Sequence, residues 1–215
     1  MIDFPKYTHI IWDWNGTLLD DAWLCVDIMN GMLSARGLPL KTLEDYRSIF
    51  NFPVRDYYEK LGYDFNKEPF TDVGMEFMVL YNQRQKESFL HPGVKEVLQL
   101  FSEAGFKQFI LSAREENELL TETRNLGVDH FFSGIYGLDD HYAHGKNHVG
   151  ARLLKEISVP PGRLVFFGDT CHDAEVAEEL GIDCILISNG HNSMERLEAL
   201  QLPIVSSLVE LKKML

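Results

Sequence analysis

Two short apolar runs, each ended by an acidic turn, most constrain the fold of this 215-residue chain. Residues 10–12 are followed at once by Asp13, and the continuously apolar residues 164–167 lead to Asp169. Apolar runs of this kind are typical of strands buried on both faces of a parallel sheet. Open α/β sheets bind ligands in the crevice outside the carboxyl ends of their strands. Both aspartates are therefore candidate site residues, and Asp13 is a candidate nucleophile because carboxylates can form aspartyl-phosphate intermediates.

The second half of the chain alternates between strand-like and helical patterns. Strand-like runs at 108–111, 134–136, 164–167 and 184–187 alternate with helical patterns at 92–104, 115–126, 146–157 and 174–180, and a last helix begins at Ser207. Such alternation predicts right-handed crossovers and a parallel sheet. We therefore predict an α/β fold with a Rossmann-like parallel sheet core and helices on both faces.

Residues 19–87 contain helical patterns only. Asp20 or Asp21 can cap a helix to about Arg36, Thr42 can cap a second, Pro53 opens a third at 54–61, and a fourth runs from about 69 to 86. The sequence thus predicts an all-helical cap, residues 19–87, inserted into a core made of residues 1–18 and 88–215.

Charge and cysteine content limit the partners and the compartment. The formal net charge of −13, with no basic run, argues against a nucleic-acid or anionic-membrane partner. No apolar run approaches the ~18 residues that a membrane span needs. Three widely spaced cysteines fit a reducing compartment, and the amino terminus has no signal-peptide pattern, so the cytoplasm is expected. The sequence does not decide between monomer and homodimer.

Four sequence motifs along the chain resemble those of a known family. The segment from Asp13 to Asp20, Asp-Trp-Asn-Gly-Thr-Leu-Leu-Asp, resembles the first motif of the haloacid dehalogenase-like hydrolase superfamily, Asp-x-Asp-Gly-Thr-Leu-x-Asp. Ser112, Lys146 and the Asp169/Asp173 pair follow in the superfamily's order. Each motif alone is weak, since strand-end Ser and Asp usually serve turns, but the ordered set is specific. The resemblance covers nearly the whole chain, and phosphoglycolate phosphatase-like members carry a helical cap at the same place.

The resemblance implies a magnesium-dependent hydrolase of a small phosphorylated metabolite that works through an aspartyl-phosphate intermediate. In that scheme Asp13 is the nucleophile and Lys146 places a positive charge beside it and the phosphate. Magnesium favours carboxylate and phosphate oxygens. The implied ligand set is Asp13, the backbone carbonyl of Asn15, Asp169 and Asp173, the last as an orienting partner of bound water or Lys146. The implied phosphate-binding set is Asp13, Trp14, Asn15, Ser112, Ala113 and Lys146, and the cap candidates for substrate contact are Arg55 and Tyr57.

Residue 15 departs from the family pattern. The family's phosphatases have an aspartate there, which protonates the leaving oxygen and later activates water, and this chain has Asn15. A carboxamide cannot exchange that proton near neutral pH, and general acid–base catalysis contributes roughly 10²–10⁴-fold. Substrates with poor leaving groups should therefore react slowly. On the sequence alone, Asn15→Asp is expected to raise alkyl phosphate hydrolysis by roughly 10²-fold or more.

Two other readings stay open on the sequence. Phosphonatase-like C–P hydrolases also lack an acid at this position and have an Asp-Trp pair, but their chemistry needs a cap lysine that forms a Schiff base. The comparable stretch here, residues 52–56, offers Arg55, which cannot form one. The second reading is a catalytically weakened homologue that binds phosphate or another ligand. Dehalogenase members carry a tyrosine at the position of Asn15 and do not need the metal for which Asp169 and Asp173 are suited.

Overall fold

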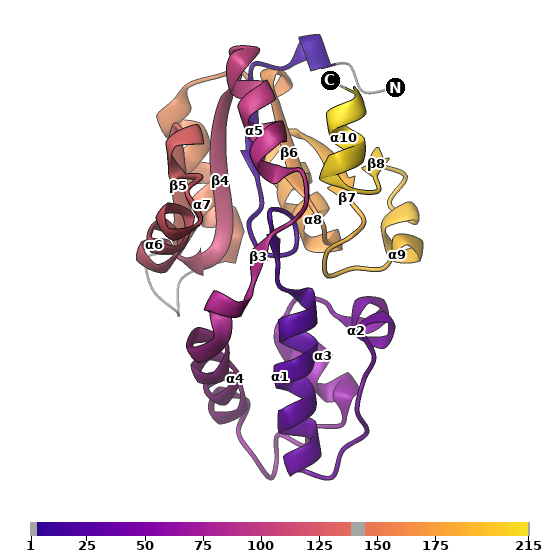
Figure 1. Ribbon diagram of the computed structural model, residues 1–215. Coiled ribbons are helices and arrows are strands. Elements are labelled where there is room, and N and C mark those ends of the chain that lie inside the picture. Colours follow the sequence, from indigo (N-terminus) through magenta and orange to yellow (C-terminus); the bar gives the residue numbers. More distant parts are fainter. Residues whose placement is uncertain (1–3, 139–144, 215) are drawn as a thin grey trace.

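A six-stranded parallel sheet forms the core, in the order β5-β4-β1-β6-β7-β8 (Figure 1). The computed structural model describes residues 4–138 and 145–214. Strand β1, His9–Trp12, lies at the centre between β4, Lys107–Glu115, and β6, Leu164–Gly168. The outer strands are β5, Gly134–Leu138, β7, Asp183–Ile187, and β8, Ile204–Val205. The predicted parallel α/β sheet is confirmed.

Helices cover both faces of this sheet because its strands are apolar on both sides. Ile10 and Trp12 of β1 pack in one buried cluster with α5, α6 and α10, whereas Ile11 packs in another with α7, α8 and α9. This alternation follows from the two-residue period of a strand. The bounds are α5 Val94–Glu103, α6 Glu116–Leu126, α7 Gly145–Ile157, α8 Cys171–Leu180, α9 Met194–Glu198 and α10 Leu208–Met214, with 3₁₀ turns at Phe4–Lys6, Asp129–Phe131 and Pro161–Arg163.

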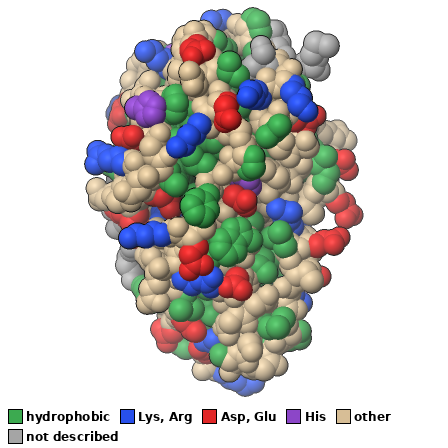
Figure 2. All heavy atoms as spheres, viewed as in Figure 1, with side chains coloured by type: hydrophobic (Ala, Val, Ile, Leu, Met, Phe, Trp, Pro, Cys, Tyr) green, Lys and Arg blue, Asp and Glu red, His purple; other side chains and the backbone are tan. Residues whose placement is uncertain are grey.

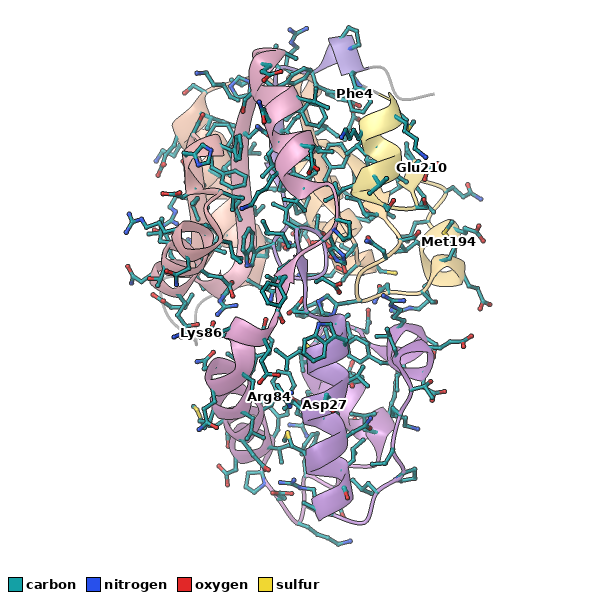
Figure 3. All side chains as sticks on the ribbon, in the orientation of Figure 1. Phe4, Asp27, Arg84, Lys86, Met194 and Glu210 are labelled. Atoms are coloured by element: carbon teal, nitrogen blue, oxygen red, sulfur yellow. The ribbon has the colours of Figure 1, made fainter. Side chains whose placement is uncertain are left out.

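Four further helices pack below the carboxyl edge of the sheet (Figure 1). They are α1 Ala22–Ala35, α2 Leu43–Ile49, α3 Val54–Leu61 and α4 Phe70–Arg84, the last continued by the 3₁₀ turn η2, Gln85–Glu87. Their apolar side chains form a buried cluster of their own. Local signals set their ends, since Thr42 makes a capping box with Asp45 and α3 ends at Gly62, whose φ is +101°. Figure 3 shows Asp27 and Arg84 on facing sides of α1 and α4, where they form an ion pair.

Two very short strands join these helices to the core. The chain leaves the core through β2, Leu19–Asp20, and returns through β3, Phe89–Leu90, and the two strands pair antiparallel. The sequence did not indicate either strand, because two residues show no periodicity. Phe89 is 69% exposed, and Figure 2 shows apolar side chains near the middle of this face of the molecule.

Four observed elements of the core, β4, α8, α9 and β8, differ from the predicted ones or are additional to them. Strand β4 does not end at Leu111 but continues to Glu115 through an irregularity in its pairing with β5. Helix α8 begins at Cys171, three residues earlier than predicted, so Asp173 lies in its first turn. Helix α9 and strand β8 were not predicted. Within the described ranges, the structure contains no helix that is both long and apolar enough to cross a membrane.

Candidate active site

Asp13, Lys146 and Asp173 form a buried ion cluster at the carboxyl edge of the sheet. Lys146 Nζ lies 2.5 Å from Asp13 Oδ1 and 2.5 Å from Asp173 Oδ1. Asp13 directly follows β1, Lys146 lies in the first turn of α7, and Asp173 lies in the first turn of α8. All three residues are at most 7% exposed. Three segments distant in sequence therefore place two carboxylates on one ammonium.

Asp169, at the end of β6, is the third carboxylate of the cluster. Its Oδ1 accepts a hydrogen bond from Thr17 Oγ1 at 2.7 Å, and its Oδ2 accepts one from the backbone N–H of His191 at 2.6 Å. A Cβ on Gly190 would lie 2.1 Å from Asp169 Oδ2, so glycine allows the loop after β7 to approach this closely. The carboxylate is thereby held from both sides.

The donor set fits a divalent cation. Oxygen atoms of Asp13, Asp169 and Asp173 all lie within 4.8 Å of one another, and all three residues are buried. Three carboxylates beside the single ammonium of Lys146 leave negative charge that burial makes costly. Magnesium and calcium prefer carboxylate oxygens, and magnesium is typically held by one or two carboxylates together with phosphate oxygens and water. The chemistry of the site thus suits magnesium.

The electrostatics of the cluster follow from burial and from Lys146. Burial raises the pKa of Asp13 well above its ordinary value, and the Lys146 ammonium opposes this rise. Burial also acts on Asp173, but Lys146 and the hydrogen bonds from Thr170 hold the pKa of that carboxyl below its ordinary value. The pKa of Lys146 is raised despite its burial, because two carboxylates face it. The ammonium therefore stays charged.

Ser112, the second predicted motif, lies on β4, the strand next to β1. Ser112 is 2% exposed, and its hydroxyl accepts a hydrogen bond from the backbone N–H of Arg114 at 3.2 Å. It lies within β4, which pairs with β1, and is therefore near the same sheet edge as Asp13. Ala113 is exposed. Trp14 turns its ring into the core, where its Nε1 donates to Glu122 at 2.6 Å.

The carboxamide nitrogen of Asn15 faces Asp21 and helix α4. Its Nδ2 donates to Asp21 Oδ2 at 2.7 Å and to the hydroxyl of Tyr81, on α4, at 2.9 Å. The sequence suggested that Asp21 could cap α1. Asp21 does lie at the N-cap position, but its side chain makes no cap hydrogen bond there and binds Asn15 and the backbone N–H of Gly16 instead.

The structure does not bring the two cap candidates to the carboxylates. Arg55 lies on the surface, where its Nε is 3.3 Å from Glu59 and its guanidinium stacks over Phe65 at 5.0 Å. Its charge is thus satisfied at the cap surface. Tyr57 is 3% exposed and packs edge-on against Tyr46 inside the cap cluster. Both side chains serve the cap itself in this structure, because α3 turns one to solvent and the other inward.

Several residues around the site were not singled out from the sequence. Thr17 belongs to the first motif, but the sequence analysis assigns it no function. Its hydroxyl donates a hydrogen bond to Asp169. His191 lies with Asn189 and Gly190 directly after the buried strand β7, and such a polar strand end was an available signal. Tyr81 gave no signal, because a tyrosine in a helix is most often a packing residue.

Comparisons with known proteins show the family to which this chain belongs. The sequence pattern of the haloacid dehalogenase-like hydrolases matches residues 10–187. Phosphoglycolate phosphatases from Pseudomonas savastanoi pv. phaseolicola and Caulobacter vibrioides are 24% and 27% identical to this chain, with 85% of it and 70% and 79% of the relatives covered. A haloacid dehalogenase-like family hydrolase from Streptococcus pneumoniae has the same fold, with a TM-score of 0.83 at 22% identity over 98% of this chain and 99% of that one. The chain therefore belongs to the haloacid dehalogenase-like hydrolase family, as its motifs predict, and is a phosphatase-like enzyme within it.

Proposed function

We propose that this enzyme hydrolyses a small phosphorylated metabolite with the help of magnesium and through an aspartyl-phosphate on Asp13. The main support is the buried ion cluster, in which Lys146 contacts both Asp13 and Asp173. One carboxylate oxygen of Asp169 lies within 4.8 Å of one oxygen of each of these two aspartates. We further propose a division into a core, residues 1–18 and 88–215, and a cap, residues 19–87, with β2 and β3 as the linkers between them. The cytoplasm stays our predicted location.

In the first step Asp13 acts as the nucleophile. One carboxylate oxygen forms a bond to phosphorus while the bond from phosphorus to the ester oxygen breaks, and the alcohol leaves as its alkoxide or phenolate. Lys146 holds Asp13 in place and offsets the charge of the incoming phosphate. Asp13, Asp169, Asp173 and the backbone carbonyl of Asn15 would hold magnesium, which when bound neutralises charge on the phosphate oxygens.

In the second step water attacks the phosphorus of the aspartyl-phosphate. The bond between phosphorus and the Asp13 oxygen breaks, the Asp13 carboxylate is restored, and the water proton ends on the departing dihydrogen phosphate. Asn15 supplies no proton to either step. The leaving group of the first step must therefore depart unaided or take its proton from solvent, and substrates with acidic leaving groups should react fastest.

The substrate class follows from the relatives as a proposal. Two of them are named phosphoglycolate phosphatases, so phosphoglycolate belongs in the first set of esters to be tried. Neither Arg55 nor Tyr57 supports a choice among metabolites, since both are engaged within the cap.

The deciding experiment is hydrolysis of an aryl phosphate with and without magnesium by wild type, Asp13→Asn and Asp27→Asn. Asp27 is an exposed carboxylate on α1 that pairs with Arg84, which makes its amide variant a matched control. We expect magnesium-dependent turnover in wild type and the control and none with Asp13→Asn. Mass spectrometry of acid-quenched enzyme should find the phosphoryl group on Asp13.

The same experiment separates the other readings. Turnover that survives Asp13→Asn would exclude the aspartyl-phosphate route. Phosphate binding without turnover in wild type would favour the weakened homologue. A phosphonatase needs a reactive cap lysine, whereas residues 52–56 offer Arg55, and Lys60, which follows that stretch, is exposed. Borohydride trapping with a phosphonoaldehyde should therefore leave the protein unmodified.

A further inference from the structure

The carboxamide of Asn15 is held in one orientation. Its Nδ2 has two acceptors, Asp21 Oδ2 at 2.7 Å and the Tyr81 hydroxyl oxygen at 2.9 Å. The reverse orientation would place the amide oxygen against a carboxylate oxygen, with no proton between them. The hydrogen-bond chemistry therefore assigns the N–H side to the cap. Because the carboxamide is planar, this also fixes the direction of Oδ1.

Asp21 and Tyr81 form a closed triangle with Asn15. The Tyr81 hydroxyl donates to Asp21 Oδ2 at 2.7 Å, while it accepts from Asn15. The other oxygen of Asp21 accepts from the backbone N–H of Gly16 at 2.9 Å, and His191 Nε2 lies 3.2 Å away. Asp21 is 1% exposed and Tyr81 6% exposed. These bonds leave Asp21 little freedom to move.

We propose that Asp21 and Tyr81 are positioning residues that act through Asn15 and present its Oδ1 as the acceptor for the water that hydrolyses the aspartyl-phosphate. Oδ1 has no hydrogen-bond partner among the residues that the structure describes, and residue 15 lies two positions from the nucleophile. An amide oxygen orients water without taking its proton, which passes to the phosphoryl group as the bond from phosphorus to Asp13 breaks. This inference rests on the proposed function.

The cap thereby gains a defined part in the second chemical step. Tyr81 lies in α4 and is 66 residues from Asn15 in sequence, so its hydroxyl reaches the nucleophile loop only when the cap packs on the core. Removing that hydroxyl takes away one of the two acceptors of Asn15 Nδ2 and should let the carboxamide swing more widely about its remaining bond to Asp21. The effect should fall on hydrolysis of the intermediate rather than on its formation.

An aryl phosphate separates the two steps. Its leaving group departs unaided, so kcat/KM reports transfer to Asp13, whereas kcat reports hydrolysis of the intermediate. Tyr81→Phe should lower kcat about tenfold, the order expected for loss of one positioning hydrogen bond. The ratio kcat/KM should stay unchanged, so KM should fall in step with kcat. Tyr63→Phe, which removes another cap hydroxyl, one that donates to Met29 Sδ at 3.5 Å, should behave as wild type.

A double-mutant cycle tests whether Tyr81 acts through Asn15. In the Asn15→Ala background, Tyr81→Phe should change kcat less than twofold. An equal loss of kcat in both backgrounds would overturn the proposal, as would a parallel fall in kcat/KM. An unchanged kcat for folded Tyr81→Phe would overturn it too.

A spectroscopic measurement keeps the inference separate from the proposed function. In ¹⁵N-asparagine-labelled protein, the side-chain N–H pair assigned by its loss in Asn15→Ala should exchange slowly with solvent. One proton of that pair should shift and lose protection in Tyr81→Phe. Rapid exchange of both protons in wild type would refute the positioning. If wild type hydrolyses no phosphate ester, the proposed function fails while this measurement still reports on the orientation of Asn15.

Discussion

Asn15→Asp introduces a second carboxylate beside a buried one. Asn15 Nδ2 lies 2.7 Å from Asp21 Oδ2, and Asp21 is 1% exposed. Two unit charges at this distance repel by about 6 kcal/mol at an effective dielectric constant near 20. The variant must therefore hold a proton between the two carboxyls or move residue 15 out of its contact with the cap. The single substitution should consequently gain far less than the 10²-fold that the sequence alone suggests.

The double variant Asn15→Asp/Asp21→Asn removes this conflict. It reverses the hydrogen bond between the two side chains, because the amide of residue 21 then donates to the carboxylate of residue 15. The other oxygen at residue 21 can still accept from the backbone N–H of Gly16. The Tyr81 hydroxyl can still donate to one side chain and accept from the other. The charge of the pair is unchanged, and the site gains an acid at residue 15.

The assay compares kcat/KM, which reports transfer to Asp13, for an alkyl and an aryl phosphate in four proteins, namely wild type, the two single variants and the double variant. We expect the double variant to gain roughly 10²-fold on the alkyl phosphate, whose alkoxide needs a proton, and much less on the aryl phosphate. Mass spectrometry must accompany each assay, because Asn15-Gly16 is prone to deamidation. An Asn15→Asp gain as large as that of the double variant would refute the repulsion argument.

Three further outcomes are expected. Millimolar magnesium should raise the melting midpoint of wild type by roughly 5–10 °C when it reaches about a hundred times its Kd, and an unchanged midpoint would count against a shared ion site. Lys146→Ala should lower the free energy of unfolding by roughly 3 kcal/mol or more in magnesium-free buffer, because Asp13 and Asp173 lose their common partner. The same variant should bind vanadate more weakly. Vanadate bound as tightly as by wild type would rule out Lys146 as the cation that binds phosphate. Burial lowers the pKa of His191, but Asp21 raises it more, to about 9. The stability from this pair is therefore complete below about pH 6.5 and lost as pH rises through about 9, and melts of His191→Gln should lack that loss.

Local patterns predicted the elements whose ends are set by nearby residues. Thr42 caps α2 three residues from its partner Asp45, and Gly62 ends α3 with a positive φ. The ends of the strands β1 and β6 could also be predicted, because each apolar run stops at an acidic turn. Since parallel strands end at one edge of a sheet, the sequence alone places Asp13 and Asp169 together.

Contacts between the helices α1–α4 and the core could not be predicted from local patterns. Arg47 of α2 donates to the backbone carbonyls of Asn189 and Gly190 at 2.7 Å each, although more than 140 residues separate them. The position of Asp21 fits a helix cap, and only the presence of Asn15 and Tyr81 around it gives it a different partner. The orientation of Arg55 was open for a related reason, because the phase of α3 decides which side chains face the core and the sequence does not set that phase.

The buried ion cluster bears on whether the site is built for turnover or only for binding. Replacing a buried ion pair with packed apolar residues is often neutral or stabilising, so stability does not account for Lys146 lying 3% exposed between two carboxylates. Phosphate binding alone does not account for it either, because Asp13 repels a phosphate dianion and a pure binding site has no use for that repulsion. A carboxylate held against the phosphate is required when it must attack phosphorus. Detection of the phosphoryl group on Asp13, rather than measurement of phosphate affinity, is therefore the observation that distinguishes an enzyme from a sensor here.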